Sequence, residues 1–426
     1  RWSVALLTER FPVFPDYYYA DARLYDAEAA VYAEHLTTGT PIPYRLTPGR
    51  ELYTWWAALF YATFGRHALG LKLVNGLLAS VSVILLVLLA VRLWPETRAG
   101  PARDPGRTAW VPGLILALWP THVFYSSQNT KEAFMLLGLA SAFWLFLGQD
   151  RSKEHEPGLR LSDGLPLLGA AALMFTGLLR SHFVPMAAVA LLTAAVWRAF
   201  LVRQQKWALA RAGRDAACVL LALALFKPVS SLTIGRWSYE ERHIPFVKGL
   251  IDARPTADAE AAQDPQGWSP AWITNLRKAR QERDDQYSLR KFDREVASQI
   301  FRGVEFRTWL DVAAFLPKAA FTVLFMPLPG LYPIEGSLGR TLACAENLAV
   351  LAACLLAFLG VWRQGRSPER SALAAFFLIV WMASALTEVD LGSATRHRLL
   401  YLPFLLPFAA WWSRPAADDG REDTQG

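Results

Sequence analysis

Long apolar stretches alternate with short polar or basic segments along most of the chain. A helix needs about 20 predominantly apolar residues to cross the hydrocarbon core of a bilayer, and several stretches approach that length. The pattern therefore predicts an all-α fold, a polytopic transmembrane helical bundle of about nine to eleven membrane helices that forms one membrane domain over 1–426. The clearest segments are 69–94, 110–126, 133–148, 165–179, 183–201, 216–235, 342–362, 372–386 and 399–412.

Three parts of the chain do not fit this apolar pattern. Residues 14–68 are polar and acidic at first and aromatic later, which predicts an outer loop with interfacial helices. Residues 236–308 form a charged insert of mixed sign, with a helical run expected from Trp272 to Phe306. The charged residues 413–426 are expected to be a disordered tail on the cytoplasmic side.

Basic residues set the expected orientation. Arg and Lys gather in the segments after 69–94, 133–148, 183–201 and 342–362. Cytoplasmic loops carry such an excess, so 14–68 is expected on the opposite, outer side. The segments 216–235 and 310–331 cannot both cross if this alternation holds. We expect 216–235 to cross and 310–331 to be re-entrant or interfacial, because prolines and Lys318 interrupt the latter. The opposite choice would place the insert in the cytoplasm.

Composition narrows the class of protein. The chain is 53% hydrophobic and 19% charged, with the charges confined to a few segments. The net charge of +7 comes from these loops, so nucleic-acid binding is not expected. Its three cysteines lie within apolar runs and lack metal-ligand spacing, so we expect no metal site from cysteine. The first residue is Arg and 1–7 is too short to span, so whether a signal-anchor or first helix precedes it is left open.

The acidic stretch 14–36 is the candidate for chemistry. Read as a helix, it places Asp21, Tyr25, Glu28 and Tyr32 on one face. A carboxylate such as Asp21 can take the proton of a sugar hydroxyl, and Tyr25 can position the acceptor. The alternative is an amphipathic helix on the membrane surface with its acids toward water.

Several cations fall on the expected outer side, where the orientation rule predicts few. They are Lys131, Arg180, His182, Arg396, His397 and Arg398. Phosphate is the anion that such residues commonly bind, and Lys131 and Arg396 each lie near the start of a predicted helix, whose free N–H groups favour an anion. Asn129 and Glu132 are expected to position the substrate, or to cap the helix that follows. For Arg396 to Arg398 the alternative is contact with lipid headgroups.

A base and several cations at a membrane boundary suit the transfer of a group from a lipid-linked phosphate to a hydroxyl. We find no Gly-rich phosphate loop or nucleotide-binding βαβ unit, and a donor presented from the membrane would need neither. No cofactor is assigned, and a divalent metal is left open.

The order of these motifs resembles the GT-C superfamily of integral membrane glycosyltransferases, the branch with the protein mannosyltransferases and the aminoarabinose transferases of lipid A. The family's acidic motif, Asp-Glu-x-x-Tyr-x-x-x-Ala, is matched here at Asp21, Tyr25 and Ala29 and departs from it at Ala22. Asp16, Asp26 and Glu28 are therefore alternative or supporting acids. The segment from Pro120 to Glu132 and the basic triplet before Pro403 are also similar to family motifs.

The resemblance implies a catalytic Asp21 and a polyprenyl-phosphate sugar as donor. It also implies an outer-face glycan, lipid or protein as acceptor, inversion at the sugar, and a multi-pass protein of the bacterial inner membrane. Two alternatives stay open. One is a glycan polymerase or ligase that uses a polyprenyl-diphosphate-linked oligosaccharide, for which 236–308 could supply a larger groove. The other is a transporter or flippase, although these usually have repeated halves or mid-membrane polar groups.

Overall fold

The chain folds into a bundle of helices in a computed structural model, which describes residues 1–11, 19–40, 51–93, 105–148, 164–201, 206–233, 271–286, 298–332, 338–363 and 367–413. Within these ranges the regular structure is helical, and the one β-type contact is an isolated bridge between Gln299 and Asp390. The all-α fold class is confirmed.

Helices account for nearly all of the described chain. They are α1 (Trp2–Arg10), α2 (Ala20–Thr38), α3 (Glu51–Phe64), α4 (Ala68–Leu93), α5 (Pro105–Leu118), α6 (Pro120–Ser126), α7 (Glu132–Leu147), α8 (Leu165–Leu179), α9 (Phe183–Leu201), α10 (Lys206–Thr233), α13 (Ala271–Gln286), α15 (Trp309–Phe325), α16 (Leu338–Arg363), α17 (Pro368–Thr387), α18 (Leu391–Leu405) and the 3-10 helix η5 (Leu406–Ser413).

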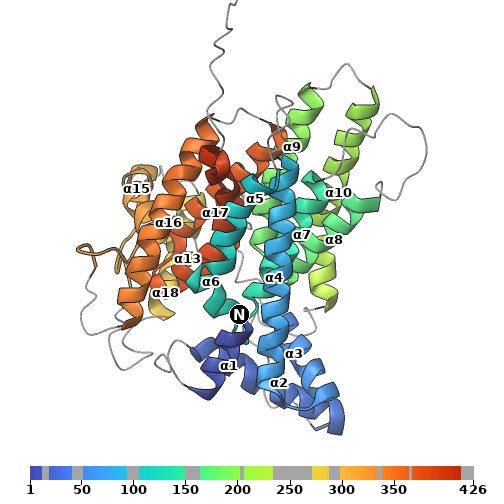
Figure 1. Cartoon of the computed structure of the whole chain (residues 1–426), viewed down its shortest axis with the longest axis vertical. Helices are drawn as coiled ribbons and strands as arrows, with labels where there is room; N and C mark the ends of the chain where they lie inside the picture. The colour runs from blue at the N-terminus through green and yellow to red at the C-terminus, as the bar shows by residue number, and fades with distance from the viewer. Residues whose placement is uncertain are drawn as a thin grey trace, which may run out of the picture.

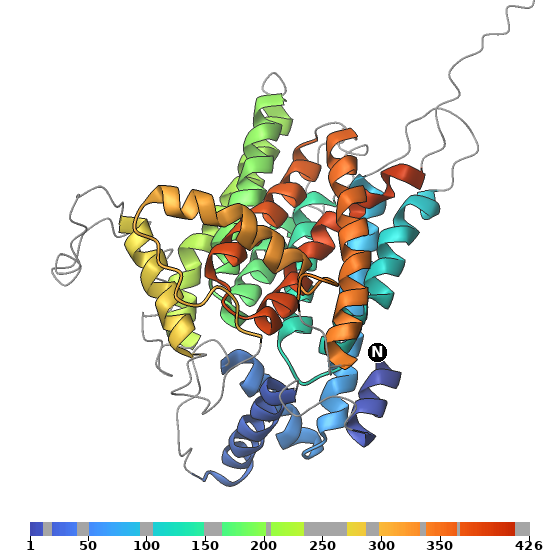
Figure 2. The same ribbon diagram turned by 90° about the vertical axis from the view of Figure 1, so that its left-hand side faces the viewer.

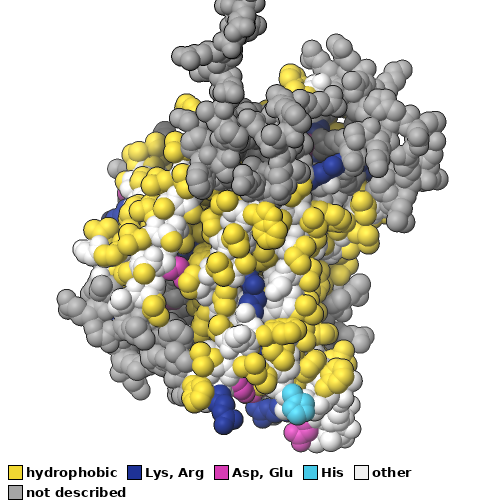
Figure 3. Space-filling model, viewed as in Figure 1, with side chains coloured by type: hydrophobic (Ala, Val, Ile, Leu, Met, Phe, Trp, Pro, Cys, Tyr) yellow, Lys and Arg dark blue, Asp and Glu magenta, His cyan; other side chains and the backbone are white. Residues whose placement is uncertain are grey.

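Most of the long helices of the bundle run side by side, and helices α1, α2 and α3 cover one end of it (Figure 1). Hydrophobic side chains cover much of the middle of this face, while charged side chains appear at the α2–α3 end (Figure 3). Four described helices, α4, α9, α16 and α17, are long and apolar enough to cross a membrane. The chain is therefore a polytopic helical membrane protein, and the other expected spans stay predictions.

The buried side of the bundle is packed closely. The rings of Phe143, Phe376 and Phe404 meet pairwise at centroid distances of 4.9 Å and join α7, α17 and α18. Helices α7 and α8 approach where Gly138 faces Thr176, since a Cβ at Gly138 would lie 2.3 Å from the Thr176 hydroxyl. Any larger residue at Gly138 would have to push the two helices apart.

The expected segment 110–126 is divided into α5 and α6. Pro120 begins α6, and Trp119 before it is extended, with φ −60° and ψ 112°. Proline lacks an N–H and disfavours helical geometry in the preceding residue, so a single straight helix cannot pass this point. After the break, α6 lies beside α1, at the end of the bundle that α1, α2 and α3 cover.

The two segments of which only one was expected to cross the membrane, 216–235 and 310–331, run in different directions relative to the bundle. Residues 216–233 of the first belong to α10, which runs along the bundle and packs against α8 and α9 (Figure 1). The second contains α15, which lies obliquely across the direction of α16 (Figure 2). Which of the two crosses the membrane remains a prediction.

The insert 236–308 is described only at 271–286 and 298–308. The prediction of a helical run from Trp272 to Phe306 is wrong, because α13 ends at Gln286 and 298–308 is not helical. Residues 298–300 instead pair with the connection between α17 and α18, through hydrogen bonds from Ile300 N to Val389 O and from Leu391 N to Ser298 O. A tertiary backbone contact of this kind overrides the local helical pattern.

Candidate functional site

Arg396 joins two carboxylates that lie far apart in the sequence. Its guanidinium hydrogen-bonds Asp21 in the first turn of α2, and its Nε lies 3.1 Å from Glu132 Oε1 at the start of α7. The Asp21 side chain is 39% exposed, whereas those of Arg396 and Glu132 are 17% and 5% exposed. The structure therefore brings the predicted base, a predicted phosphate ligand and Glu132 into one cluster, with Asp21 at its open side.

A second chain of contacts continues from this cluster. Arg180, in the turn between α8 and α9, hydrogen-bonds the ring of His397, whose Nδ1 lies 2.5 Å from Glu388 Oε1. Arg283 on α13 lies 3.1 Å from the same Glu388 oxygen. Arg283 belongs to no motif, so the sequence had no signal to single it out.

The turn between α6 and α7 is held from inside the bundle. The amide of Asn75 on α4 donates to the backbone carbonyls of Gln128 at 2.6 Å and Thr130 at 3.1 Å. Lys131 donates to the carbonyl of Leu179 at 3.0 Å and is buried beside Arg180 and Glu132. The capping interpretation of this turn is wrong, since Lys131 is the N-cap of α7 and no side chain caps it. Asn129 is buried, and its Oδ1 has no hydrogen-bond partner among the described residues.

Arg398 contacts residues outside the cluster of Asp21, Arg396 and Glu132. It is 1% exposed and donates to the Leu324 carbonyl at 2.6 Å and to the Asn347 side-chain oxygen at 2.8 Å. These contacts connect α18 with α15 and α16. They favour a structural role for Arg398, and its assignment to the donor phosphate stays a prediction.

The predicted acidic face of α2 is mostly buried against α3. Tyr25 packs edge-on against Tyr53 at 4.9 Å, and Glu28 accepts a hydrogen bond from Thr54 at 3.4 Å. Both contacts fix α3 on α2 and leave neither side chain at the open side of the cluster. Tyr25 therefore has a packing role in the structure, and its role in positioning the acceptor stays a prediction.

The other alternative acids are placed differently. Asp26 points to a separate side of α2, where it accepts from Tyr61 and pairs with Arg66 at 2.6 Å. Asp16 lies outside the described residues. Of the four acids considered from the sequence, Asp21 is the described one that meets the outer cations.

Burial and charge together set the protonation of the groups in the connecting turns. Burial alone would raise the pKa of Glu388, but His397, Arg283 and Arg180 outweigh it and hold the pKa below its usual range. Burial and the nearby Arg180 lower the pKa of His182 well below its usual value. At neutral pH Glu388 is a carboxylate, and His182 is a neutral ring that can offer a hydrogen bond but no charge.

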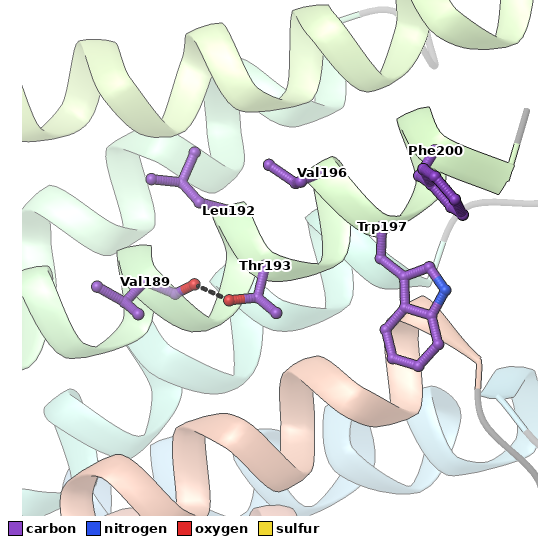
Figure 4. Close-up of a pocket in the computed structure, with 6 residues that line it drawn as sticks. All are labelled: Val189, Leu192, Thr193, Val196, Trp197 and Phe200. Atoms are coloured by element: carbon purple, nitrogen blue, oxygen red, sulfur yellow. Dashed lines mark hydrogen bonds between the residues drawn. The ribbon is translucent and has the colours of Figure 1, made fainter. Parts of the chain in front are cut away.

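No group of three or more His, Cys, Asp or Glu side chains that could hold a metal ion occurs in the described ranges. A wide apolar hollow lies elsewhere, along the outward side of α9, lined by residues from Val189 to Phe200 (Figure 4). It carries no charged group, so it does not belong to the candidate site. The chemistry available at the candidate site is that of a half-exposed carboxylate beside several fixed cations.

No protein-family model matches the chain. It is similar to an undecaprenyl phosphate-alpha-4-amino-4-deoxy-L-arabinose arabinosyl transferase of Pseudomonas fluorescens, with 32% identity over 105 residues. That alignment covers 20% of this chain and 19% of the relative, so the match spans about a fifth of the relative's length. A solved structure of ArnT from Cupriavidus metallidurans in the apo state aligns over 91% of this chain and 72% of that one, with 14% identity and a TM-score of 0.34.

Proposed function

We propose that the protein is a membrane glycosyltransferase that moves a sugar from a polyprenyl-phosphate donor to a hydroxyl group of an acceptor at the outer face of the membrane. The observation that carries the proposal is the contact of Asp21 with Arg396, which places a candidate base beside a candidate phosphate ligand. The similar arabinosyl transferase carries undecaprenyl phosphate in its name, which supports the same class of donor.

The reaction needs one proton acceptor and one anion stabiliser. Asp21 takes the proton of the acceptor hydroxyl, and the acceptor oxygen attacks the anomeric carbon of the donor sugar. The bond between that carbon and the phosphate oxygen breaks, and the bonding electrons leave on the polyprenyl phosphate. The products are a glycosylated acceptor, with inversion at the anomeric carbon, and polyprenyl phosphate with one additional negative charge.

Cations at the site would stabilise that additional charge. Arg396, Lys131 and Arg180 surround Glu132 closely enough to act on its ionisation, so all three belong to one electrostatic cluster. Fixed cations in a partly buried site stabilise developing negative charge more strongly than water does. Asn129, with its buried Oδ1, lies in the same turn and would face the donor headgroup.

The distribution of arginines supports an outer-face site. Arg92, Arg198 and Arg370 lie at the ends of α4, α9 and α17 that point away from α2 (Figure 1). Arginine-rich ends of membrane helices face the cytoplasm, which would place α2 and Asp21 on the opposite side. A bacterial inner membrane, with an outer-face glycan, lipid or protein as acceptor, would follow from the same orientation.

The test is a donor screen with a matched pair of variants. Membranes containing the full chain are supplied with radiolabelled polyprenyl-phosphate sugars, and both labelled acceptor and released polyprenyl phosphate are measured. We expect Asp21→Asn to lower transfer by at least about 100-fold, because general-base catalysis contributes on that scale. Asp26→Asn is the control, because Asp26 pairs with Arg66 on another side of α2. Transfer that survives in Asp21→Asn, or a wild-type chain that consumes no donor, would contradict the proposal.

A further inference from the structure

We infer that the insert positions the phosphate-binding side of the site: Arg283 on α13 holds Glu388, Glu388 holds His397, and His397 orients Arg180. The inference rests on the proposed function, because it assigns a task to residues around the same site. It makes α13 a part of the transferase site in spite of its distance from Asp21 in the sequence.

Helix α13 is fixed firmly against the bundle. Arg280 is buried and donates to the carbonyls of Leu386 at 3.1 Å and Phe301 at 3.0 Å. Its guanidinium also lies 4.9 Å from the ring centroid of Phe315 on α15. A buried arginine with two carbonyl acceptors and an aromatic face has little freedom to move. Arg283, one turn further along α13, is therefore presented to the α17–α18 connection in a defined position.

The same connection is held from a second direction. The backbone of 298–300 pairs with that of 389–391, and Asp390 accepts hydrogen bonds from Ser298 and from Ser393 N at 2.7 Å. Asp390 is thereby the N-cap of α18, the helix that carries Arg396 and His397. The insert thus contacts the start of α18 through both its backbone and its side chains.

Arg283 ends in contact with the α17–α18 connection. Its terminal nitrogen lies 3.2 Å from the Thr387 carbonyl and 3.1 Å from Glu388 Oε1. The Arg283 side chain is 32% exposed, while that of Glu388 is 3% exposed. A carboxylate buried to this extent needs a compensating cation, and Arg283 is one that reaches it directly.

The protonation of His397 follows from its two partners. An arginine N–H can only donate, so the His397 nitrogen that contacts Arg180, Nε2, must accept and carries no proton. The proton of the neutral ring is then on Nδ1, which donates to Glu388. Glu388 therefore selects the tautomer of His397 that can hold Arg180 by its guanidinium.

Loss of Arg283 should disturb this arrangement without touching the reacting atoms. Glu388 would keep its negative charge with one cation fewer, which favours a second proton on His397. A doubly protonated ring cannot accept from Arg180 and repels it. The titratable and charged groups near His397 are Glu388, Arg180 and His182, with Arg396 beside it on α18, and Arg283 acts on it through Glu388. The expected consequence is weaker donor binding with a smaller loss in the chemical step, because Arg180 contacts the donor phosphate before and during the transfer.

The experiment compares Arg283→Gln with Lys278→Gln, which removes an exposed cation from the same helix. With the full chain in membranes, we expect Arg283→Gln to raise the donor KM by about 10-fold or more, as loss of a supporting partner of a site ligand typically does. The kcat should fall by a smaller factor than KM rises, because Arg180 also stabilises the departing phosphate while Asp21 and Arg396 are untouched. Arg283→Lys keeps a cation at this position, so its donor KM should be close to that of wild type. Lys278→Gln should have the wild-type KM and kcat.

A double-mutant cycle with Arg180→Gln adds a second readout. If Arg283 acts through Arg180, the double variant should raise KM no further than Arg180→Gln alone, whereas independent residues would multiply their effects. A normal KM in Arg283→Gln, or independent effects in the cycle, would overturn the inference and leave the transferase proposal intact. A loss of kcat and thermal stability that Arg283→Lys does not restore would also overturn it, because that result is expected of a purely structural residue. If the wild-type chain transfers no sugar, the proposed function itself fails.

Discussion

Arg396 on α18 hydrogen-bonds Asp21 on α2, across 375 residues of sequence. The same guanidinium also pairs with Glu132. One arginine therefore forms ion pairs with two carboxylates at the boundary of the bundle. The contact uses the planar, forked shape of arginine, whose Nη1 faces Asp21 while its Nε faces Glu132, and a lysine would present a single nitrogen to both.

Replacement of Arg396 by lysine should therefore lower sugar transfer by about 100-fold, the scale expected when a reacting group is displaced by about an ångström. The positive charge is kept, so protein abundance should change little. Initial rates in membranes with equal protein content provide the measurement. Arg66→Lys is the control, since Arg66 is 60% exposed and pairs with Asp26. Equal rates for Arg396→Lys and wild type would remove Arg396 from the site.

Arg398→Met should lower stability more than it lowers donor binding. The change leaves the Leu324 carbonyl and the Asn347 side chain without their charged donor inside the bundle. Unsatisfied buried acceptors cost about 1–3 kcal/mol. Thermal unfolding of the detergent-solubilised protein should show a lower Tm, while the donor KM of the remaining folded protein stays unchanged. A higher KM at unchanged Tm would instead assign Arg398 to the phosphate.

Stability should fall between pH 7.5 and pH 5.5, in part because of His182. Burial and the neighbouring Arg180 hold the pKa of His182 well below the value of 6.5 for a free side chain. As the pH falls through that value, the unfolded chain binds a proton that the native His182 does not bind. Stability then decreases by up to about 1.4 kcal/mol per pH unit for this group.

Glutamine binds no proton in the native or the unfolded chain. The decrease in Tm between pH 7.5 and pH 5.5 should therefore be smaller for His182→Gln than for wild type. The control is His67→Gln, at an exposed position between α3 and α4. If His182→Gln and wild type lose the same Tm, the native ring is protonated together with the unfolded one and the structural assignment is wrong.

Cysteine labelling tests the orientation of the bundle. The natural cysteines, Cys218, Cys344 and Cys354, are buried, so they should contribute little background. A cysteine at exposed Thr38, at the end of α2, should react with a membrane-impermeant maleimide added to intact cells. A cysteine in place of Trp362, which is 89% exposed at the far end of α16, should react only after the membrane is opened. The reverse pattern would place Asp21 in the cytoplasm.

Sequence pattern was sufficient to locate several helices of the bundle, because burial in lipid leaves long apolar runs that are read directly. The expected segments 165–179 and 183–201 coincide with α8 and α9. The sequence pattern was not sufficient where a tertiary contact determines the backbone conformation. Residues 298–300, for example, pair with another segment instead of continuing a helix.

For the site, the sequence could predict that Asp21 and several cations lie near the same end of the bundle, since the order of apolar and basic segments sets which helix ends lie together. It could not tell which cations face Asp21, because the partner of each side chain depends on the rotation of its helix. Arg396 faces Asp21, whereas Arg398, two residues later, faces Asn347 inside the bundle. A rotation of about 200° separates two such positions on an α-helix.

The double engagement of Arg396 has a kinetic consequence. Until an anion competes for the guanidinium, the Asp21 oxygen that it occupies is unavailable to an incoming alcohol. In the proposed reaction the phosphate of the donor is such an anion, so its arrival would free the carboxylate. Substrates would then add in a fixed sequence, lipid carrier before alcohol, and a water molecule entering the unloaded protein would meet a base that is already engaged.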